Sequence, residues 1–280
     1  MNSRRLKDWV KKLFNWESLP SSKRWLIKFR LCKISALVFN FIPLSVTSLC
    51  RFYGSDKWGS YFYTHTYENI FRPLKYEKLN LLEIGVGGYD DPYSGGESVF
   101  LWKSYFPFAR LFFVDIVDKT HFSQSRVKVF AGSQDDVNVL QGVVDATEKF
   151  DVIIDDGSHV NRHQIESFEI LFPSLRGGGI YVIEDTQTSY WPSFGGGNTE
   201  TPEYENSCMR YFLRLGNELN YGEFLDENFS PSEYSKNIIE ISFHHNMIVV
   251  VKGSNDQVPV AETRNVLALK QSMDFNPEEK

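Results

Sequence analysis

Residues 150–159 read FDVIIDDGSH and residues 179–186 read GIYVIEDT, and these two stretches decide the fold. Each begins with an apolar run, residues 150–154 and residues 179–183, of the kind that forms a buried parallel strand. Each run then ends in acidic residues. Open α/β sheets place their ligands at the carboxyl ends of the strands, so the two acidic clusters are predicted to meet at one edge of a sheet.

Strand and helix patterns alternate around these two stretches. Strands are predicted over residues 79–84, 111–116, 127–130, 150–154 and 179–183, and helices over residues 96–106, 135–147, 160–175 and 203–219. Residues 177–179 are three glycines, which we expect to end the helix before the fifth strand. Two last strands, residues 237–243 and 247–252, predict a β-hairpin. The pattern predicts an α/β fold with a Rossmann-like, doubly wound, mostly parallel seven-stranded sheet and a terminal antiparallel hairpin.

The 280 residues suit one large α/β domain with an appendage, and 42% hydrophobic residues suffice for a sizeable core. Charge is distributed unevenly. Residues 1–33 contain ten Lys or Arg and two acids, a formal charge of +8, whereas the whole chain carries −6, so the remainder carries −14. Such an acidic body argues against a nucleic-acid groove. Three scattered cysteines argue against a disulfide framework and favour a reducing, cytoplasmic compartment.

The N-terminal segment is predicted to be a basic helical arm over residues 1–50. Residues 34–50 contain no charge, but these 17 residues include Asn40 and Pro43 and are short for a membrane span. Two interpretations remain open: the arm lies on the surface of the cytoplasmic membrane, or it packs on the main domain. The main domain is predicted over residues 51–253, and a polar C-terminal tail over residues 254–280.

The turn after the first strand indicates a nucleoside cofactor. Glu83 precedes Gly85 and Gly87, whose lack of side chains would let a ligand approach the backbone closely. Asp90 stands where a dinucleotide fingerprint has its third glycine, which disfavours an NAD-linked oxidoreductase. An acid at Glu83 suits a cationic ligand with an amino group, and Asp115 at the end of the second strand can accept ribose hydroxyls.

The two acidic clusters indicate a hard-metal site with a base beside it. His159 follows Asp156 by three residues, beyond a Gly-Ser turn. Asp155 is expected to face the other side of the strand and to hold structure, because strand neighbours alternate faces. His163 is either a second base or an ordinary helix-surface residue. The aromatic segment around Tyr190 and Trp191 is either a lid that stacks on a sugar ring or a connection with buried aromatic residues.

The order of these motifs resembles class I S-adenosylmethionine-dependent methyltransferases, and more narrowly the metal-dependent sugar O-methyltransferases of macrolide biosynthesis. The resemblance rests on residues 53–57 (YGSDK), 82–88 (LEIGVGG), 114–116 (VDI), 132–134 (GSQ), 154–159 (IDDGSH) and 183–186 (IEDT). It covers about residues 51–195. The macrolide enzymes carry an additional N-terminal domain that helps to form the substrate site and the oligomer, and residues 1–50 stand in its place here.

The resemblance implies a role for individual residues. Asp156, Glu184 and Asp185 match the Mg²⁺ ligands, and His159 matches the catalytic base. The residues that match contacts to S-adenosyl-L-methionine, or that lie near its adenine, are Ser55, Asp56, Glu83, Gly85, Gly87, Asp115, Ser133 and Gln134. The resemblance implies an acceptor that is a small molecule or a glycan. The product would be a methylated sugar of a natural product, a glycolipid or a polysaccharide precursor. A homo-oligomer is compatible with the family.

Three other functions remain as hypotheses. A phenol or catechol O-methyltransferase needs the same cation and similar carboxylates, and only substrate screening separates it from a sugar O-methyltransferase. An NAD-linked oxidoreductase would change absorbance at the nicotinamide band. A non-catalytic, membrane-associated module has no need for Asp156, His159, Glu184 and Asp185 together.

Overall fold

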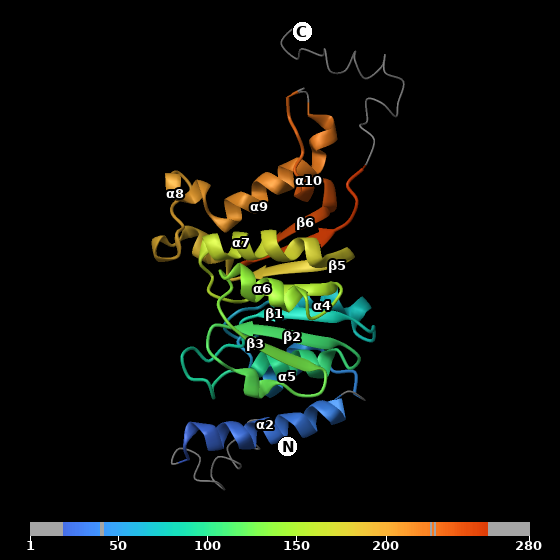
Figure 1. Ribbon diagram of the computed structural model, residues 1–280, viewed down its shortest axis with the longest axis vertical. Coiled ribbons are helices and arrows are strands. Elements are labelled where there is room, and N and C mark those ends of the chain that lie inside the picture. Colours follow the sequence, from blue (N-terminus) through green and yellow to red (C-terminus); the bar gives the residue numbers. More distant parts are fainter. Residues whose placement is uncertain (1–18, 40–41, 225, 227, 257–280) are drawn as a thin grey trace.

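A seven-stranded sheet runs through the whole molecule, with helices packed on both faces (Figure 1). The computed structural model describes residues 19–39, 42–224, 226 and 228–256. The strands are β1 (Asn80–Ile84), β2 (Arg110–Asp115), β3 (Val127–Ala131), β4 (Phe150–Asp155), β5 (Leu175–Glu184), β6 (Ile238–His244) and β7 (Met247–Lys252). The helices are α2 (Ser21–Phe39), α3 (Val46–Tyr53), α4 (Thr64–Phe71), α5 (Glu97–Tyr105), α6 (Val137–Val144), α7 (Asn161–Leu171), α8 (Pro202–Glu205), α9 (Cys208–Asn217) and α10 (Glu233–Asn237).

The strand order is β3-β2-β1-β4-β5-β7-β6. Strands β1 to β5 pair in parallel, whereas β7 is antiparallel to both β5 and β6. The predicted fold class, a doubly wound sheet with a terminal antiparallel hairpin, is therefore confirmed. The order reverses between β1 and β4, so the crevice for a ligand is expected beyond the carboxyl ends of these two strands.

Each face of the sheet carries its own apolar core because strand neighbours point to opposite sides. On one face, Leu81 and Val152 pack with side chains of α3, α4 and α5. On the other face, Leu82 and Ile153 pack with side chains of α6, α7 and α9. All six residues of β4 are buried, as expected for a strand covered by helices on both faces.

The segment before β5 differs from the prediction. Gly177, Gly178 and Gly179 lie inside β5 and do not end the preceding helix. Helix α7 stops at Leu171, and a 3₁₀ turn that contains Pro173 follows. Proline has no N–H to donate and disfavours helical geometry at the residue before it, so the proline ends the helix. The helix predicted over residues 203–219 is also divided, because Ser207 caps the start of α9.

Helix α2 packs against α5 at one end of the molecule (Figure 1). Trp25, Phe29 and Cys32 contact the core, and Ala36 is buried. The described part of the arm, from residue 19 onward, thus packs on the main domain. Residues 1–18 of the predicted arm and residues 257–280 of the predicted tail lie outside the described residues. Among the helices that the structure describes, none has both the length and the apolar character of a membrane span.

Candidate active site

The carboxyl ends of β1, β4 and β5 are held close together by backbone contacts. The N–H of Asp156 donates to the carbonyl of Ile84 at 3.0 Å, so pairing between β1 and β4 continues one residue past β4. Gly85 follows β1 with a φ of +97°, and a Cβ there would lie 2.1 Å from the carbonyl oxygen of Asp156. Glycine is therefore required at this position, and the first βα turn lies directly against Asp156.

A cavity of about 760 Å³ opens at this edge of the sheet. Seven of the eight predicted cofactor-contact residues line it: Ser55, Asp56, Gly85, Gly87, Asp115, Ser133 and Gln134. Asp156, His159 and Asp185 line the same cavity, with Tyr61, Trp191 and Phe194. The predicted cofactor contacts and the predicted base therefore share one space.

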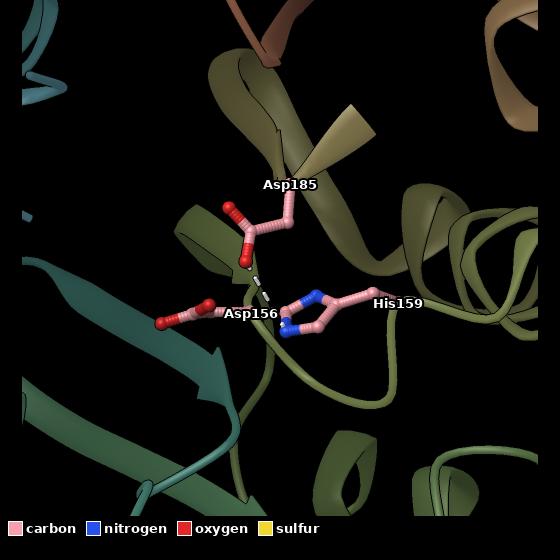
Figure 2. Close-up of side chains that lie close together, drawn as sticks. All are labelled: Asp156, His159 and Asp185. Atoms are coloured by element: carbon pink, nitrogen blue, oxygen red, sulfur yellow. Dashed lines mark ion pairs between the residues drawn. The ribbon is translucent and has the colours of Figure 1, made fainter. Parts of the chain in front are cut away.

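Asp156, His159 and Asp185 form one cluster at the cavity wall (Figure 2). Each offers one ligand atom, and these atoms lie within 4.8 Å of one another. His159 Nε2 is 3.4 Å from Asp185 Oδ2, and in the described part of the chain His159 Nδ1 has no hydrogen-bond partner. Carboxylate oxygens are the donors that Mg²⁺ prefers, and the cluster is open to the cavity, so these residues fit a divalent cation that keeps positions for other ligands.

Two residues of this cluster have unusual backbone conformations. His159 has a φ of 57° and Asp185 a φ of 56°, both in the left-handed region that residues other than glycine rarely adopt. Such conformations carry a modest energetic cost and concentrate at functional sites. Tyr63 stabilises one of them, because its hydroxyl donates to Asp185 Oδ1 at 2.6 Å. Burial and this carboxylate raise the pKa of Tyr63, so its hydroxyl stays a donor.

Glu184 lies deeper than Asp185 and meets a residue for which the sequence analysis proposed no role. Lys57 Nζ lies 2.6 Å from Glu184 Oε1 and 2.6 Å from Asp156 Oδ2. The Tyr67 hydroxyl also donates to Glu184 Oε1. Lys57 is 1% exposed. Burial lowers the pKa of Lys57, but the carboxylates outweigh burial and raise it well above the usual range, so the side chain stays charged.

Glu83 is the one predicted cofactor contact that does not line the cavity. It is fully buried, with Oε1 3.3 Å from Lys57 Nζ and Oε2 accepting from Trp102 Nε1 at 3.1 Å. Burial raises the pKa of Glu83 to about 7, against the opposite effect of Lys57. Contact between Glu83 and a cofactor stays a prediction. In the structure the carboxylate of Glu83 forms an ion pair with Lys57 and accepts a hydrogen bond from Trp102.

Asp115 holds the turn that surrounds the cavity. Oδ2 accepts from the N–H of Val86 and Oδ1 from the N–H of Val117, each at 2.9 Å. The buried Lys119 lies 3.5 Å from Asp115 Oδ2 and donates to the carbonyl of Gly87. Asp115 therefore joins the turns after β1 and β2 and still lines the cavity, where ribose hydroxyls would reach it.

Asp155 points away from the cavity, as the alternation of strand faces predicted. Its Oδ2 accepts from Ser167 Oγ at 2.5 Å, and Gln134 Nε2 donates to both oxygens. Gln134 Oε1 accepts from the N–H of Ser158 at 2.6 Å. Gln134 therefore braces the loop that carries His159. His163, one helical turn further, hydrogen-bonds Ser158 Oγ at 2.9 Å.

The aromatic segment after Asp185 forms one wall of the cavity and is anchored by Asn161. The buried Asn161 Nδ2 donates to the carbonyls of Thr188 and Phe194 at 3.0 and 2.9 Å. Its Oδ1 accepts from Ser189 Oγ at 3.0 Å and from the N–H of Cys208 at 2.8 Å. One side chain thus ties the start of α7 to this segment and to α9. The aromatic residues of this segment are not buried, since Tyr190 and Trp191 are exposed and Phe194 is half-buried, so the interpretation as a connection with buried aromatic residues is wrong; the role as a lid stays a prediction.

Sequence reasoning missed Lys57, Tyr63, Tyr67 and Asn161. Lys57 belonged to a quoted motif, but a lysine in a loop is usually exposed, and no periodic pattern shows that it is buried. Tyr63, at the N-cap of α4, and Tyr67, inside α4, are four residues apart, which places them on one face of the helix. That spacing was a usable signal for a shared role, although it does not show that the face meets Glu184 and Asp185.

The fold matches that of class I S-adenosylmethionine-dependent methyltransferases. Within that class, the chain is similar to sugar O-methyltransferases of natural-product pathways. It is 38% identical to the mycinamicin VI 2''-O-methyltransferase of Micromonospora griseorubida over 214 residues, which are 76% of this chain and 53% of that protein. It is 39% identical to the 8-demethyl-8-alpha-L-rhamnosyl tetracenomycin-C 2'-O-methyltransferase of Streptomyces olivaceus over 204 residues, 72% of this chain and 53% of that protein.

Among solved structures, the chain is similar to the mycinamycin-pathway methyltransferase MycE in complex with Mg and SAH. The TM-score is 0.75 at 36% identity, over 82% of this chain and 60% of MycE. A MycE complex that also holds mycinamycin VI is similar at the same TM-score, 0.75. The chain spans about half the length of the curated relatives it matches. No family model matches it.

Proposed function

We propose that this protein is an S-adenosylmethionine- and Mg²⁺-dependent O-methyltransferase that methylates a hydroxyl of a sugar, on a small molecule or a glycan. One observation carries the proposal: Asp156, His159 and Asp185 face the same cavity that Gly85, Gly87 and Asp115 line. Similarity to sugar O-methyltransferases, and to MycE with its bound Mg and SAH, supports this function.

The proposed division of labour follows from the cavity walls. Gly85 and Gly87 let the methyl donor lie against the backbone, and Asp115 accepts its ribose hydroxyls. Asp156 and Asp185 hold the cation. Glu184, the third ligand that the resemblance implies, contacts Lys57 and does not line the cavity, so its role as a ligand stays a prediction. Bound Mg²⁺ would favour the alkoxide form of the acceptor hydroxyl, and S-adenosylmethionine would supply the methyl group.

His159 is the proposed general base. Its Nε2 points toward Asp185, so it is placed to take the proton of a hydroxyl bound between the two aspartates. Tyr61, Trp191 and Phe194 would hold the acceptor ring and exclude water, and much of the rate would come from keeping the two reactants aligned. Burial and Asp185 raise the pKa of Tyr61 to about 12, so Tyr61 acts as a hydrogen-bond donor.

Calorimetry of S-adenosylmethionine binding tests the cofactor site. We expect micromolar affinity for the wild type, loss of binding in Asp115→Ala, and retained binding in the control Asp118→Ala, whose carboxylate contacts Thr120. Circular dichroism of Asp115→Ala excludes unfolding as the cause. An absence of binding by the wild type, with Mg²⁺ or with EDTA, would contradict the methyltransferase function.

Acceptor screening then decides the substrate class. We expect methyl transfer to glycosides with free neighbouring hydroxyls, abolished by EDTA and restored by Mg²⁺. Transfer to catechols, with none to glycosides, would favour the phenol O-methyltransferase instead. Similarity to sugar O-methyltransferases favours the sugar, whereas the aromatic wall next to the carboxylates fits a sugar or a catechol, because each presents a ring face to an aromatic side chain and hydroxyls to a metal.

The outer face of α2 motivates a second proposal, that the protein also binds anionic membrane surfaces peripherally. Lys23, Leu26, Arg30 and Ile34 repeat at helical spacing and are exposed, and the opposite face of α2 packs on the core. Basic residues beside exposed apolar side chains are typical of helices at anionic lipid surfaces. The measurement is co-sedimentation with phosphatidylglycerol vesicles. We expect Lys23→Glu/Arg30→Glu to abolish it, and wild-type protein that stays in the supernatant would refute the proposal.

A further inference from the structure

Lys57 places a fixed positive charge at the centre of three strand ends. Its Nζ contacts Glu83 from β1, Asp156 after β4 and Glu184 from β5, at 3.3, 2.6 and 2.6 Å. The side chains of Lys57 and Glu184 are each 2% exposed, and the side chain of Glu83 is fully buried. An ammonium group taken out of water needs such partners, and buried carboxylates need such a cation.

The ionisable residues around Lys57 and at the cavity form two groups that share Asp156. The inner group is Glu83, Asp156 and Glu184, around Lys57; the outer group is Asp156, His159 and Asp185, at the cavity. Lys57 contacts one oxygen of each inner carboxylate: Oε1 of Glu83, Oδ2 of Asp156 and Oε1 of Glu184. The second oxygen of each is not used by the ammonium group. The ammonium group of Lys57 therefore already occupies the place of a cation between the inner carboxylates.

We propose that Lys57 is a positioning residue that acts as the resident cation of this carboxylate cluster, confines a divalent cation to the outer side of Asp156, and limits how tightly that cation binds. The proposal rests on the metal site of the proposed function. Lys57 also keeps the cluster stable when no metal is bound, because it offsets the mutual repulsion of the buried carboxylates.

Electrostatics gives the direction of the effect. An ammonium group 2.6 Å from Asp156 repels a divalent cation that binds the same carboxylate. Without Lys57, the divalent cation meets more uncompensated negative charge and binds more tightly. The metal-free state loses its only compensating ammonium group among the described residues of the inner group, so its stability falls. Both changes increase the stabilisation that metal binding confers.

Lys57→Met in the full chain is the test, since methionine fills a similar volume without charge. Thermal unfolding is recorded in EDTA and in excess Mg²⁺, and Mg²⁺ affinity is measured by calorimetry. We expect at least tenfold tighter Mg²⁺ binding and a larger Mg²⁺-dependent rise in Tm than in the wild type. Folding of the variant only in the presence of Mg²⁺ would be the extreme form of the same result.

Lys75→Met is the matched control, because Lys75 is also buried but donates to the carbonyl of Leu44, away from the cluster. Its Mg²⁺ response should equal that of the wild type. Lys57→Arg keeps the charge and should bind Mg²⁺ within about threefold of the wild type. This variant keeps the proposal testable if Lys57→Met fails to fold under both conditions, and tenfold tighter binding by Lys57→Arg would overturn it.

The outcomes separate this inference from the proposed function. A wild type that binds no Mg²⁺ contradicts the metal-dependent function itself. A wild type that binds Mg²⁺, with equal or weaker binding by Lys57→Met, overturns the role of Lys57 and leaves the methyltransferase function intact.

Discussion

Gly85 is the residue on which the geometry of the site most directly depends. Its φ of +97° and the 2.1 Å approach of the Asp156 carbonyl leave no room for a Cβ. Gly85→Ala should lower the free energy of unfolding by about 2 to 5 kcal/mol, through backbone strain and displacement of Asp156. Urea denaturation measures this loss, and cofactor calorimetry should show weaker binding.

Gly142→Ala is the control for Gly85→Ala. Gly142 lies inside α6, and nothing lies within 4 Å of a Cβ built there. Alanine loses less backbone entropy than glycine in a helix, so this variant should gain about 0.5 to 1 kcal/mol. If both variants had wild-type stability, the close approach of Gly85 to Asp156 would be refuted.

Asp156 belongs both to the inner group around Lys57 and to the outer group at the cavity. Asp156→Ala should reduce methyl transfer by about 100-fold or more, since the cation stabilises developing charge by several kcal/mol, while S-adenosylmethionine binding persists. Methyl-transfer kinetics and calorimetry on one preparation separate the two effects. Asp151→Ala, at the start of the same strand, is the control and should keep its kcat. Full activity of Asp156→Ala would refute the metal assignment.

At the scale of elements, one loop and two helices meet at a single side chain. Asn161 makes four hydrogen bonds to the segment after β5 and to α9, all buried or partly buried. Asn161→Ala leaves their donors and acceptors unpaired and should cost about 2 to 4 kcal/mol of stability. The aromatic wall should also loosen, so KM for the acceptor should rise more than kcat falls.

Denaturation and steady-state kinetics check the Asn161 prediction. Asn138→Ala is the control, because Asn138 is exposed on α6 and should change stability by less than about 0.5 kcal/mol. Unchanged acceptor KM in Asn161→Ala would mean that the segment after β5 does not contribute to acceptor binding.

At the scale of the whole molecule, the burial of Lys103 on α5 makes the free energy of unfolding depend on pH. Burial lowers the pKa of Lys103 to about 8, with help from Arg126 and Lys33. The ordinary value is 10.5, so between about pH 8 and 10.5 the unfolded chain binds more protons than the folded one. The contribution of Lys103 to the free energy of unfolding should therefore rise with pH across this window, and the cost of keeping Lys103 charged is present in full below it.

Lys103→Met removes that cost. We expect a gain of about 1 to 3 kcal/mol at neutral pH, reduced by the lost hydrogen bond to Gln124, and a gain that shrinks as pH approaches 10. Urea midpoints at neutral pH and at about pH 9.5 measure it. Lys128→Met, on the exposed side of β3, should show no such trend. A gain that grows with pH would reverse the assigned sign.

Much of the architecture could be predicted because it depends on local pattern. Apolar runs that end in acids identified β4 and β5, and the strand–helix alternation implied a parallel sheet with its site at the carboxyl edge. Five of the eight predicted cofactor contacts lie at or after strand ends and line the cavity for the same reason, whereas Ser55 and Asp56, which the family resemblance implied, line it without such a pattern. The glycines inside β5 were misinterpreted because glycine marks helix ends and strand irregularities alike, and Pro173 was the better signal.

The sequence by itself determined the fold class and the edge of the sheet at which Asp156, His159 and Asp185 gather, since strand periodicity and the ends of strands are local properties. Only the tertiary structure decided that Glu83 and Glu184 are grouped around Lys57, away from Asp185 and His159. Lys57 and Glu184 are 127 positions apart, and Asn161 and Cys208 are 47 apart. Such residues pair because a buried polar group needs a hydrogen-bond or ion-pair partner, and local sequence patterns do not indicate which distant residue will be that partner.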